Sequence, residues 1–125
     1  FVAGFLGSPA MNMLKGTVAG GDRPAVEIDG TMLSPGPGHD VREGQEVIFG
    51  IRPEHLALAD EGGLEARVSV VETTGSETLV FLRFGERELV ALFRERHHFE
   101  PGQTIRLLPR PDHVHLFDAG TGQRI

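Results

Sequence analysis

SVVETTGSETLVFLRF, residues 69–84, is the stretch from which the fold is predicted, because it describes a β-hairpin. The segments on both sides of its centre are rich in β-branched and aromatic residues, which favour strands. Between them, Gly75 is able to take the positive φ that a tight turn needs, and Glu72 and Glu77 flank it. Two antiparallel strands joined at Gly75 are the simplest interpretation.

Short apolar segments of the same kind lie on both sides of this hairpin, separated by clusters of Gly, Pro and Asp that are typical of turns. Residues 34–44, SPGPGHDVREG, contain two prolines and three glycines and are predicted to form an exposed loop. Short strands at such spacing favour an all-β barrel or sandwich. Eight strands are predicted, within residues 13–20, 24–30, 46–52, 64–75, 77–85, 87–95, 103–110 and 113–118.

The first seven residues, FVAGFLG, are the one segment with a convincing helical pattern. A helix here would end at Gly7, Ser8 and Pro9. Its apolar residues would share one face and would need a partner to cover them. These residues are Phe1, Val2, Phe5 and Leu6.

Composition limits the classes of function. The chain has 125 residues, which suits a single domain over residues 1–125 with a sizeable core. It contains no cysteine, which excludes disulfides and thiolate metal sites, and its formal net charge of −6 argues against nucleic acid as a partner. The sequence begins with Phe1 rather than Met, from which we expect that it is part of a longer protein.

Residues 50–58, GIRPEHLAL, raise the question of a site at the end of a predicted strand. Pro53 lacks a backbone donor and biases Arg52 toward an extended conformation, so the strand is expected to give way here to one helical turn. Arg52 and Glu54 would then form a strand-end ion pair or clamp the turn. The alternative is that they contact a partner domain.

Catalytic, metal and nucleotide sites are not predicted in this chain. His113 and His115 would share one face of a strand, which suits two metal ligands, but a third ligand is missing and structural histidines are the better interpretation. The chain lacks a G-x-S-x-G elbow, a P-loop and a G-x-G-x-x-G loop. We therefore expect no enzyme activity, no metal and no cofactor in this chain.

Four segments, in this order, resemble the C-terminal regulatory domain of the ATP-binding subunits of bacterial sugar importers, of the maltose and glycerol-3-phosphate type of ABC transporter. The resemblance implies an OB-like β-barrel called a transport-associated OB (TOBE) domain. It also implies that residues 1–12 lead out of a preceding ATPase domain, which would bind ATP and Mg²⁺. The segments are FVAGFLGSPAMNML (1–14), GIRPEHL (50–56), VVETTGSETLVF (70–81) and HLFDAGTGQRI (115–125).

In that family two ATP-binding subunits pair, and these domains contact each other. The resemblance thus implies a homodimer in which the domain is a hinge for the ATPase dimer at the cytoplasmic side of the inner membrane. The implied partners are a second copy, the ATPase domain, regulatory proteins and, through the parent subunit, the membrane subunits. Candidate contact residues are Arg52, Glu54, His55, Glu72, Gly75 and Glu77.

Two other functions are open to an OB-like barrel. One is the sensing of a small ligand, an oxyanion or a transported solute, by backbone N–H groups around Gly75. The other is binding of single-stranded nucleic acid, which needs aromatic side chains on which bases stack. The chain has no Trp or Tyr and an excess of acidic residues, so no nucleic-acid partner is expected.

Overall fold

The computed structural model describes residues 11–20, 23–95 and 97–125. The helix expected over residues 1–7, with the apolar residues Phe1, Val2, Phe5 and Leu6, lies outside this part of the chain. The described residues form ten β-strands and two short 3₁₀ turns. In this part of the chain no helix has the length and apolar character to cross a membrane.

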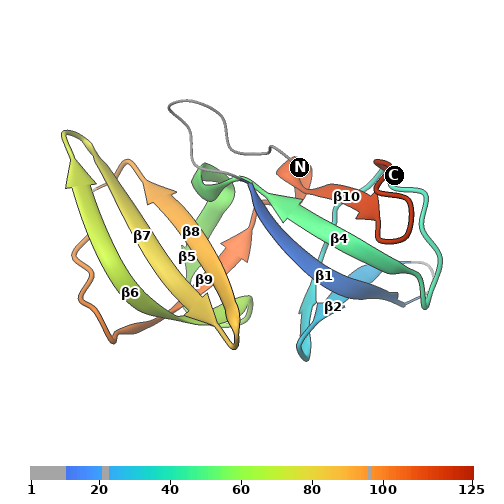
Figure 1. Ribbon diagram of the computed structural model, residues 1–125, viewed down its shortest axis with the longest axis horizontal. Helices are drawn as coiled ribbons and strands as arrows, with labels where there is room; N and C mark the ends of the chain where they lie inside the picture. The colour runs from blue at the N-terminus through green and yellow to red at the C-terminus, as the bar shows by residue number, and fades with distance from the viewer. Residues whose placement is uncertain (1–10, 21–22, 96) are drawn as a thin grey trace.

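The strands form two antiparallel sheets of five strands each, which lie beside one another in Figure 1. The first sheet has the order β10-β4-β1-β2-β3, with β10 (His115–Asp118), β4 (Glu46–Ile51), β1 (Asn12–Ala19), β2 (Ala25–Ile28) and β3 (Thr31–Leu33). The second has the order β5-β9-β6-β7-β8, with β5 (Leu56–Ala59), β9 (Thr104–Pro109), β6 (Leu64–Thr74), β7 (Glu77–Phe84) and β8 (Arg87–Phe93).

The all-β, OB-like fold class is confirmed, and each of the eight predicted strands overlaps one of the observed strands. The hairpin of residues 69–84 is present as β6 and β7, and Gly75 has a φ of 56° at its turn. The prediction missed β3 and β5, which are only three and four residues long. A signal for β3 was available, because Asp29 and Gly30 form the two-residue positive-φ turn that favours a hairpin.

One hydrophobic core draws on both sheets. In β1, the alternating residues Leu14 and Val18 are buried, as are Val47 and Phe49 in β4, because every second side chain of a strand points to the same face. In the second sheet the same alternation buries residues of β6, β7, β8 and β9, among them Leu64, Val80, Leu89 and Leu107. Both sheets therefore depend on a shared interior.

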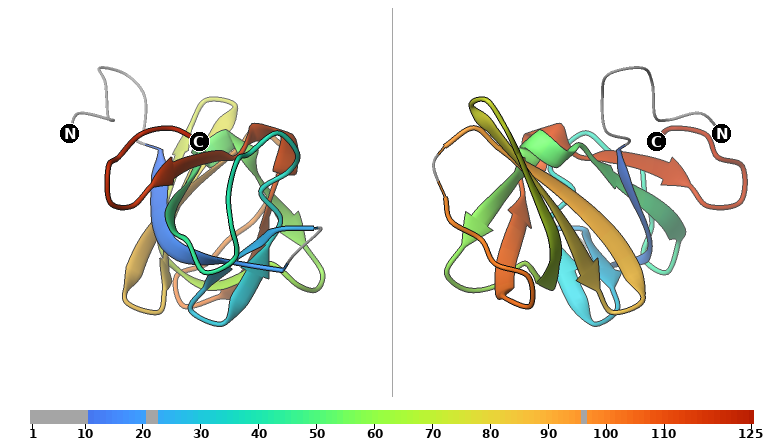
Figure 2. Two further views of the ribbon diagram at one scale, coloured as in Figure 1. Left: turned by 90° about the vertical axis from the view of Figure 1, so that its right-hand side faces the viewer. Right: turned by 60° about the vertical axis from the view of Figure 1, so that its left-hand side comes forward.

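The described part of the chain passes between the sheets twice, and each passage is a 3₁₀ turn that begins with proline. The turn η1 (Pro53–His55) joins β4 to β5, and η2 (Pro111–His113) joins β9 to β10. The backbone N–H of Arg110 donates to the carbonyl oxygen of His55 at 2.9 Å, so the two passages are bonded to each other. Figure 2 shows the two turns together at the junction between the sheets.

The side chain of Asn12 makes a third link between the sheets. Asn12 lies in β1 and is 6% exposed. Its Nδ2 donates to the carbonyl oxygen of Val90 in β8 at 2.9 Å and to that of Ile51 at 3.1 Å, while its Oδ1 accepts from the N–H of Val90 at 2.8 Å. The amide thus bonds the free edge of β8 much as a neighbouring strand would.

Replacing Asn12 with alanine is expected to lower the free energy of unfolding by about 2–4 kcal/mol, because three hydrogen bonds are lost at a largely buried site. Urea denaturation monitored by circular dichroism measures this loss. Thr17→Ala on the exposed face of the same strand is the matched control and should change stability by less than about 0.5 kcal/mol. If Asn12→Ala costs no more than this control, Asn12 does not link the sheets.

Candidate functional site

The junction of the two turns brings His55 and His113 together. Their rings are stacked, with centroids 3.8 Å apart and planes inclined by 13°. His55 is partly buried, and its Nδ1 has no hydrogen-bond partner among the described residues. Burial, followed by the nearby His113, lowers the pKa of His55 below the ordinary value of 6.5. The junction therefore favours a neutral imidazole at His55.

A repeated sequence pattern, which was not among the predicted features, produces this junction. Residues 52–56 read RPEHL and residues 110–114 read RPDHV, so each passage has arginine, proline, an acid, histidine and an aliphatic residue in the same order. In both copies proline begins the 3₁₀ turn, and the final aliphatic residue, Leu56 or Val114, enters the core. Comparing the two segments would have predicted two equivalent turns.

The structure contradicts the expectation that His113 and His115 share a face of one strand. His113 belongs to η2, where Pro111 starts a turn, and only His115 lies in β10. Burial, followed by the charge of Arg124, lowers the pKa of His115 as well. In the described part of the chain, no group of three or more histidine, aspartate or glutamate side chains is arranged to hold a metal ion.

Stability should fall on acidification below about pH 6.5, because the unfolded chain binds protons at His55 and His115 more readily than the folded chain. Because the folded-state pKa values are lowered, these two groups contribute fully to stability at pH values above the unfolded-state pKa. This contribution is lost as the pH falls through the folded-state pKa values. For His55 the charges of Arg52, Arg110 and His113 favour this loss, and Glu54 opposes it. Urea unfolding at about pH 7.5 and about pH 5 measures the difference.

The variant His55→Phe should reduce that pH dependence, since it keeps a ring against His113 and removes the titrating group. His98→Phe is the matched control, because the His98 side chain is 87% exposed and its replacement should leave the pH dependence unchanged. Equal pH dependence in the wild type and in His55→Phe would exclude the junction as its source.

Two adjoining surface grooves meet at Arg94, directly after β8. The first is lined by the hydroxyl side chains of Thr73, Ser76 and Thr78 together with Gly75, and the second by Glu54, Leu58 and Arg110. Arg94, Glu95 and His97 line both grooves. The Nε of Arg94 donates to the Oε2 of Glu77 at 3.0 Å, so this cation is already paired with a carboxylate. Mixed charge of this kind suits recognition of a protein surface.

The structure places the predicted contact residues in three locations. Glu54, Gly75 and Glu77 lie at or beside the grooves around Arg94. His55 lies in the junction. The ion pairs of the described residues do not include one between Arg52 and Glu54; instead the carbonyl oxygen of Arg52 accepts from the N–H of His55 at 2.9 Å and closes the turn. Glu72 lies apart, on the outer face of β6.

The sequence matches two domain families. Residues 49–117 match the TOBE domain family, and residues 7–56 match the MalK OB fold domain family. Together these matches cover both passages between the sheets.

Curated relatives match over the whole chain. An uncharacterized ABC transporter ATP-binding protein, y4oS of Sinorhizobium fredii, is 48% identical over 126 residues, which are 100% of this chain and 34% of that protein. The sn-glycerol-3-phosphate import ATP-binding protein UgpC of Salmonella typhi is 42% identical over 130 residues, 100% of this chain and 36% of that protein. The chain thus spans about a third of the length of these relatives.

A solved structure shares the fold. The cytoplasmic molybdate-binding protein ModG, crystallised with molybdate bound, superposes with a TM-score of 0.66 over 84% of this chain and 94% of the ModG chain. The sequences are 17% identical, so the likeness concerns the fold alone.

Proposed function

The chain belongs to the TOBE domain family, and from this we propose that it is the regulatory and dimerisation domain of the ATP-binding subunit of a bacterial ABC importer. The observation that carries the proposal is that the entire chain matches about a third of the length of each of these ABC ATP-binding relatives, which include a glycerol-3-phosphate import protein. The proposed cargo class is sugars, polyols or glycerol-3-phosphate. The proposed location is peripheral, at the cytoplasmic side of the inner membrane, with the membrane subunits contacted only through the rest of the ATP-binding subunit.

We propose that the domain acts as a hinge: it keeps two ATP-binding subunits joined while their ATPase domains bind ATP and Mg²⁺, open and close. A hinge needs a body that stays rigid while the attached domains move. The shared core, the bonded pair of turns and the Asn12 amide all support such rigidity. A regulatory protein that binds this body would act by favouring one state of the dimer, with a coupling of about 1–3 kcal/mol.

The pairing role predicts that the 125-residue chain forms a homodimer, measured by sedimentation equilibrium over a series of concentrations. Removing residues 1–7 should leave this dimer intact, because the proposed contact belongs to the barrel and not to the connecting segment. A chain that stays monomeric up to about 1 mM would contradict the pairing role, since an affinity weaker than that corresponds to less than about 4 kcal/mol.

The same role predicts that this chain by itself neither binds nor hydrolyses ATP, because it lacks a P-loop. Isothermal calorimetry with Mg-ATP tests the prediction, with a full-length ATP-binding relative as the positive control. Micromolar affinity in the 125-residue chain would show that the domain has been misassigned.

The first groove gives a specific reason to keep ligand sensing as a second candidate. Its three hydroxyl side chains and the Gly75 turn offer hydrogen bonds to an oxyanion or a polyol, and the fold is shared with a protein that binds molybdate. The pairing of Arg94 with Glu77 weakens this case for an anion. Calorimetric titration with molybdate, sulfate and glycerol-3-phosphate distinguishes the candidates, with Thr78→Val as the variant that should abolish any binding in this groove.

A further inference from the structure

The outer face of β6, β7 and β8 carries an apolar patch where an antiparallel sheet usually exposes polar residues. Val70 pairs with Phe81, and Phe81 pairs with Val90, so these three side chains form one row across the strands. Leu79 and Leu92 form the neighbouring row with Glu72. Val70 is 50% exposed, and the other four apolar residues are partly exposed. We call Val70, Leu79, Phe81, Val90 and Leu92 the apolar ladder.

The ladder is confined to one half of the second sheet. On the other half, the outer residues of β6 are charged, and Glu65 pairs with Arg106 of β9 at 2.6 Å, while Leu108 at the far end of β9 is a separate exposed apolar residue. A β-bulge between Val68 and Val70 separates the two halves, because it shifts the register with β7 and places Val70 beside Phe81. A contiguous apolar patch with a polar border is typical of a surface that binds another protein.

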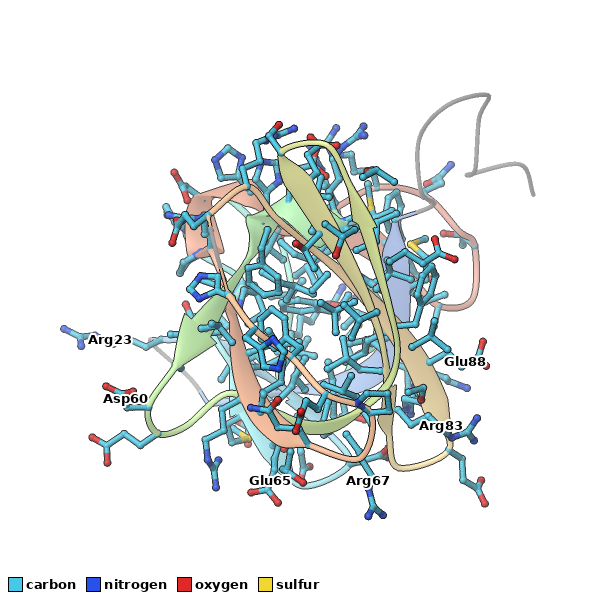
Figure 3. All side chains as sticks on the ribbon, turned by 90° about the vertical axis from the view of Figure 1, so that its left-hand side faces the viewer. Arg23, Asp60, Glu65, Arg67, Arg83 and Glu88 are labelled. Atoms are coloured by element: carbon cyan, nitrogen blue, oxygen red, sulfur yellow. The ribbon has the colours of Figure 1, made fainter. Side chains whose placement is uncertain are left out.

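Opposite charges lie at the two ends of the ladder. Beyond the Val70–Phe81–Val90 row, Arg67 and Arg83 are direct cross-strand neighbours, an arrangement of like charges that is unfavourable by itself. Figure 3 shows both arginines, with Glu88, toward one end of the sheet, and Glu88 lies 3.8 Å from Arg83. Glu72 lies at the other end, and none of the ion pairs among the described residues involves it.

We propose that the ladder is the surface on which a second copy of this chain packs, face to face, about a two-fold axis that runs along the Val70–Phe81–Val90 row. This inference rests on the proposed pairing function and assigns it to a surface. Rotation about such an axis places each apolar residue of the row opposite the same residue of the second copy, and it exchanges the two ends of the patch. Arg67 of one copy then faces Glu72 of the second copy, twice, as a self-complementary interface requires.

Arg67 and Glu72 do not form an ion pair with each other within one copy. They are five positions apart on β6, but the bulge takes up one position, so they are separated by about four strand steps, roughly 13 Å. The Nε of Arg67 donates instead to the carbonyl oxygen of Gly102 at 3.3 Å. A salt bridge between them therefore exists only across the interface. The ladder supplies the apolar centre of the contact and the charges supply its rim, the arrangement found in protein interfaces that bury about 800 Å² from each partner.

The first experiment replaces Val70 with lysine in the 125-residue chain and measures dimer affinity by sedimentation equilibrium. Because the two-fold axis puts both new charges in the apolar centre, the dissociation constant should rise at least about a hundredfold. Met32→Lys is the matched control: Met32 is 52% exposed on β3 of the other sheet, and its replacement adds the same charge away from the ladder. Circular dichroism and urea unfolding check that both variants keep the fold.

The second experiment tests the direction of the axis by exchanging charges. Arg67→Glu and Glu72→Arg should each weaken the dimer about tenfold, and the double variant should restore the wild-type affinity to within about threefold, because each new pair forms between copies. Rescue within one copy is excluded by the separation of the two residues along β6. Additive weakening in the double variant would overturn the proposed arrangement.

The outcomes separate this inference from the function on which it rests. A wild-type dimer whose affinity is unchanged by Val70→Lys would overturn the ladder as the interface and leave the pairing function standing. A wild-type chain that stays monomeric would overturn the pairing function, and this surface with it. A wild-type dimer that Val70→Lys disrupts and Met32→Lys preserves supports both.

Discussion

The hydrogen bond from the N–H of Arg110 to the carbonyl oxygen of His55 fixes the relation between the two sheets. Within the described residues the chain passes between the sheets only at η1 and η2, so the positions of these turns determine how the two halves of the core meet. Stacking of His55 on His113 adds contact at the same point, and both turns start from proline, which restricts the backbone before any tertiary contact forms. The Asn12 amide then joins β1 to β8 at a separate position.

The sequence predicted the fold well because its signals are local. Alternating apolar residues and glycine turns located eight strands, and Pro53 correctly marked the end of a strand and the start of a turn. β3 has only three residues, too few for alternation to be detected, and β5 consists of LALA, in which alanine has little preference for a strand. His113 lies in a turn and not in the predicted strand because Pro111 starts a 3₁₀ turn. The same effect of proline was predicted at Pro53 but not at Pro111, in the second copy of the pattern.

The candidate site was only partly predictable, because it depends on contacts between residues that are far apart in the sequence. Glu77 was identified beside the Gly75 turn, but its partner Arg94 lies directly after another strand, β8, so their pairing depends on the folded sheet. The apolar ladder could not be derived from alternation, since the bulge in VSVVE leaves either Val70 or Val71 free to face outward. The register with β7 decides this, and register is a property of the folded sheet.

The distribution of reactive and apolar groups suits a domain that positions a partner rather than one that catalyses a reaction. Arg94, which lines both grooves, is paired with a carboxylate, whereas the outer face of β6–β8 carries a row of apolar residues. A rigid body with one such face is able to hold a partner in a fixed orientation, because the passages and the Asn12 amide prevent the two sheets from moving independently. Strain applied at the start of β1 would therefore be transmitted through Asn12 to β8, and β8 forms one side of the apolar ladder. In a hinge, this coupling makes the geometry of pairing sensitive to the segment that enters the domain.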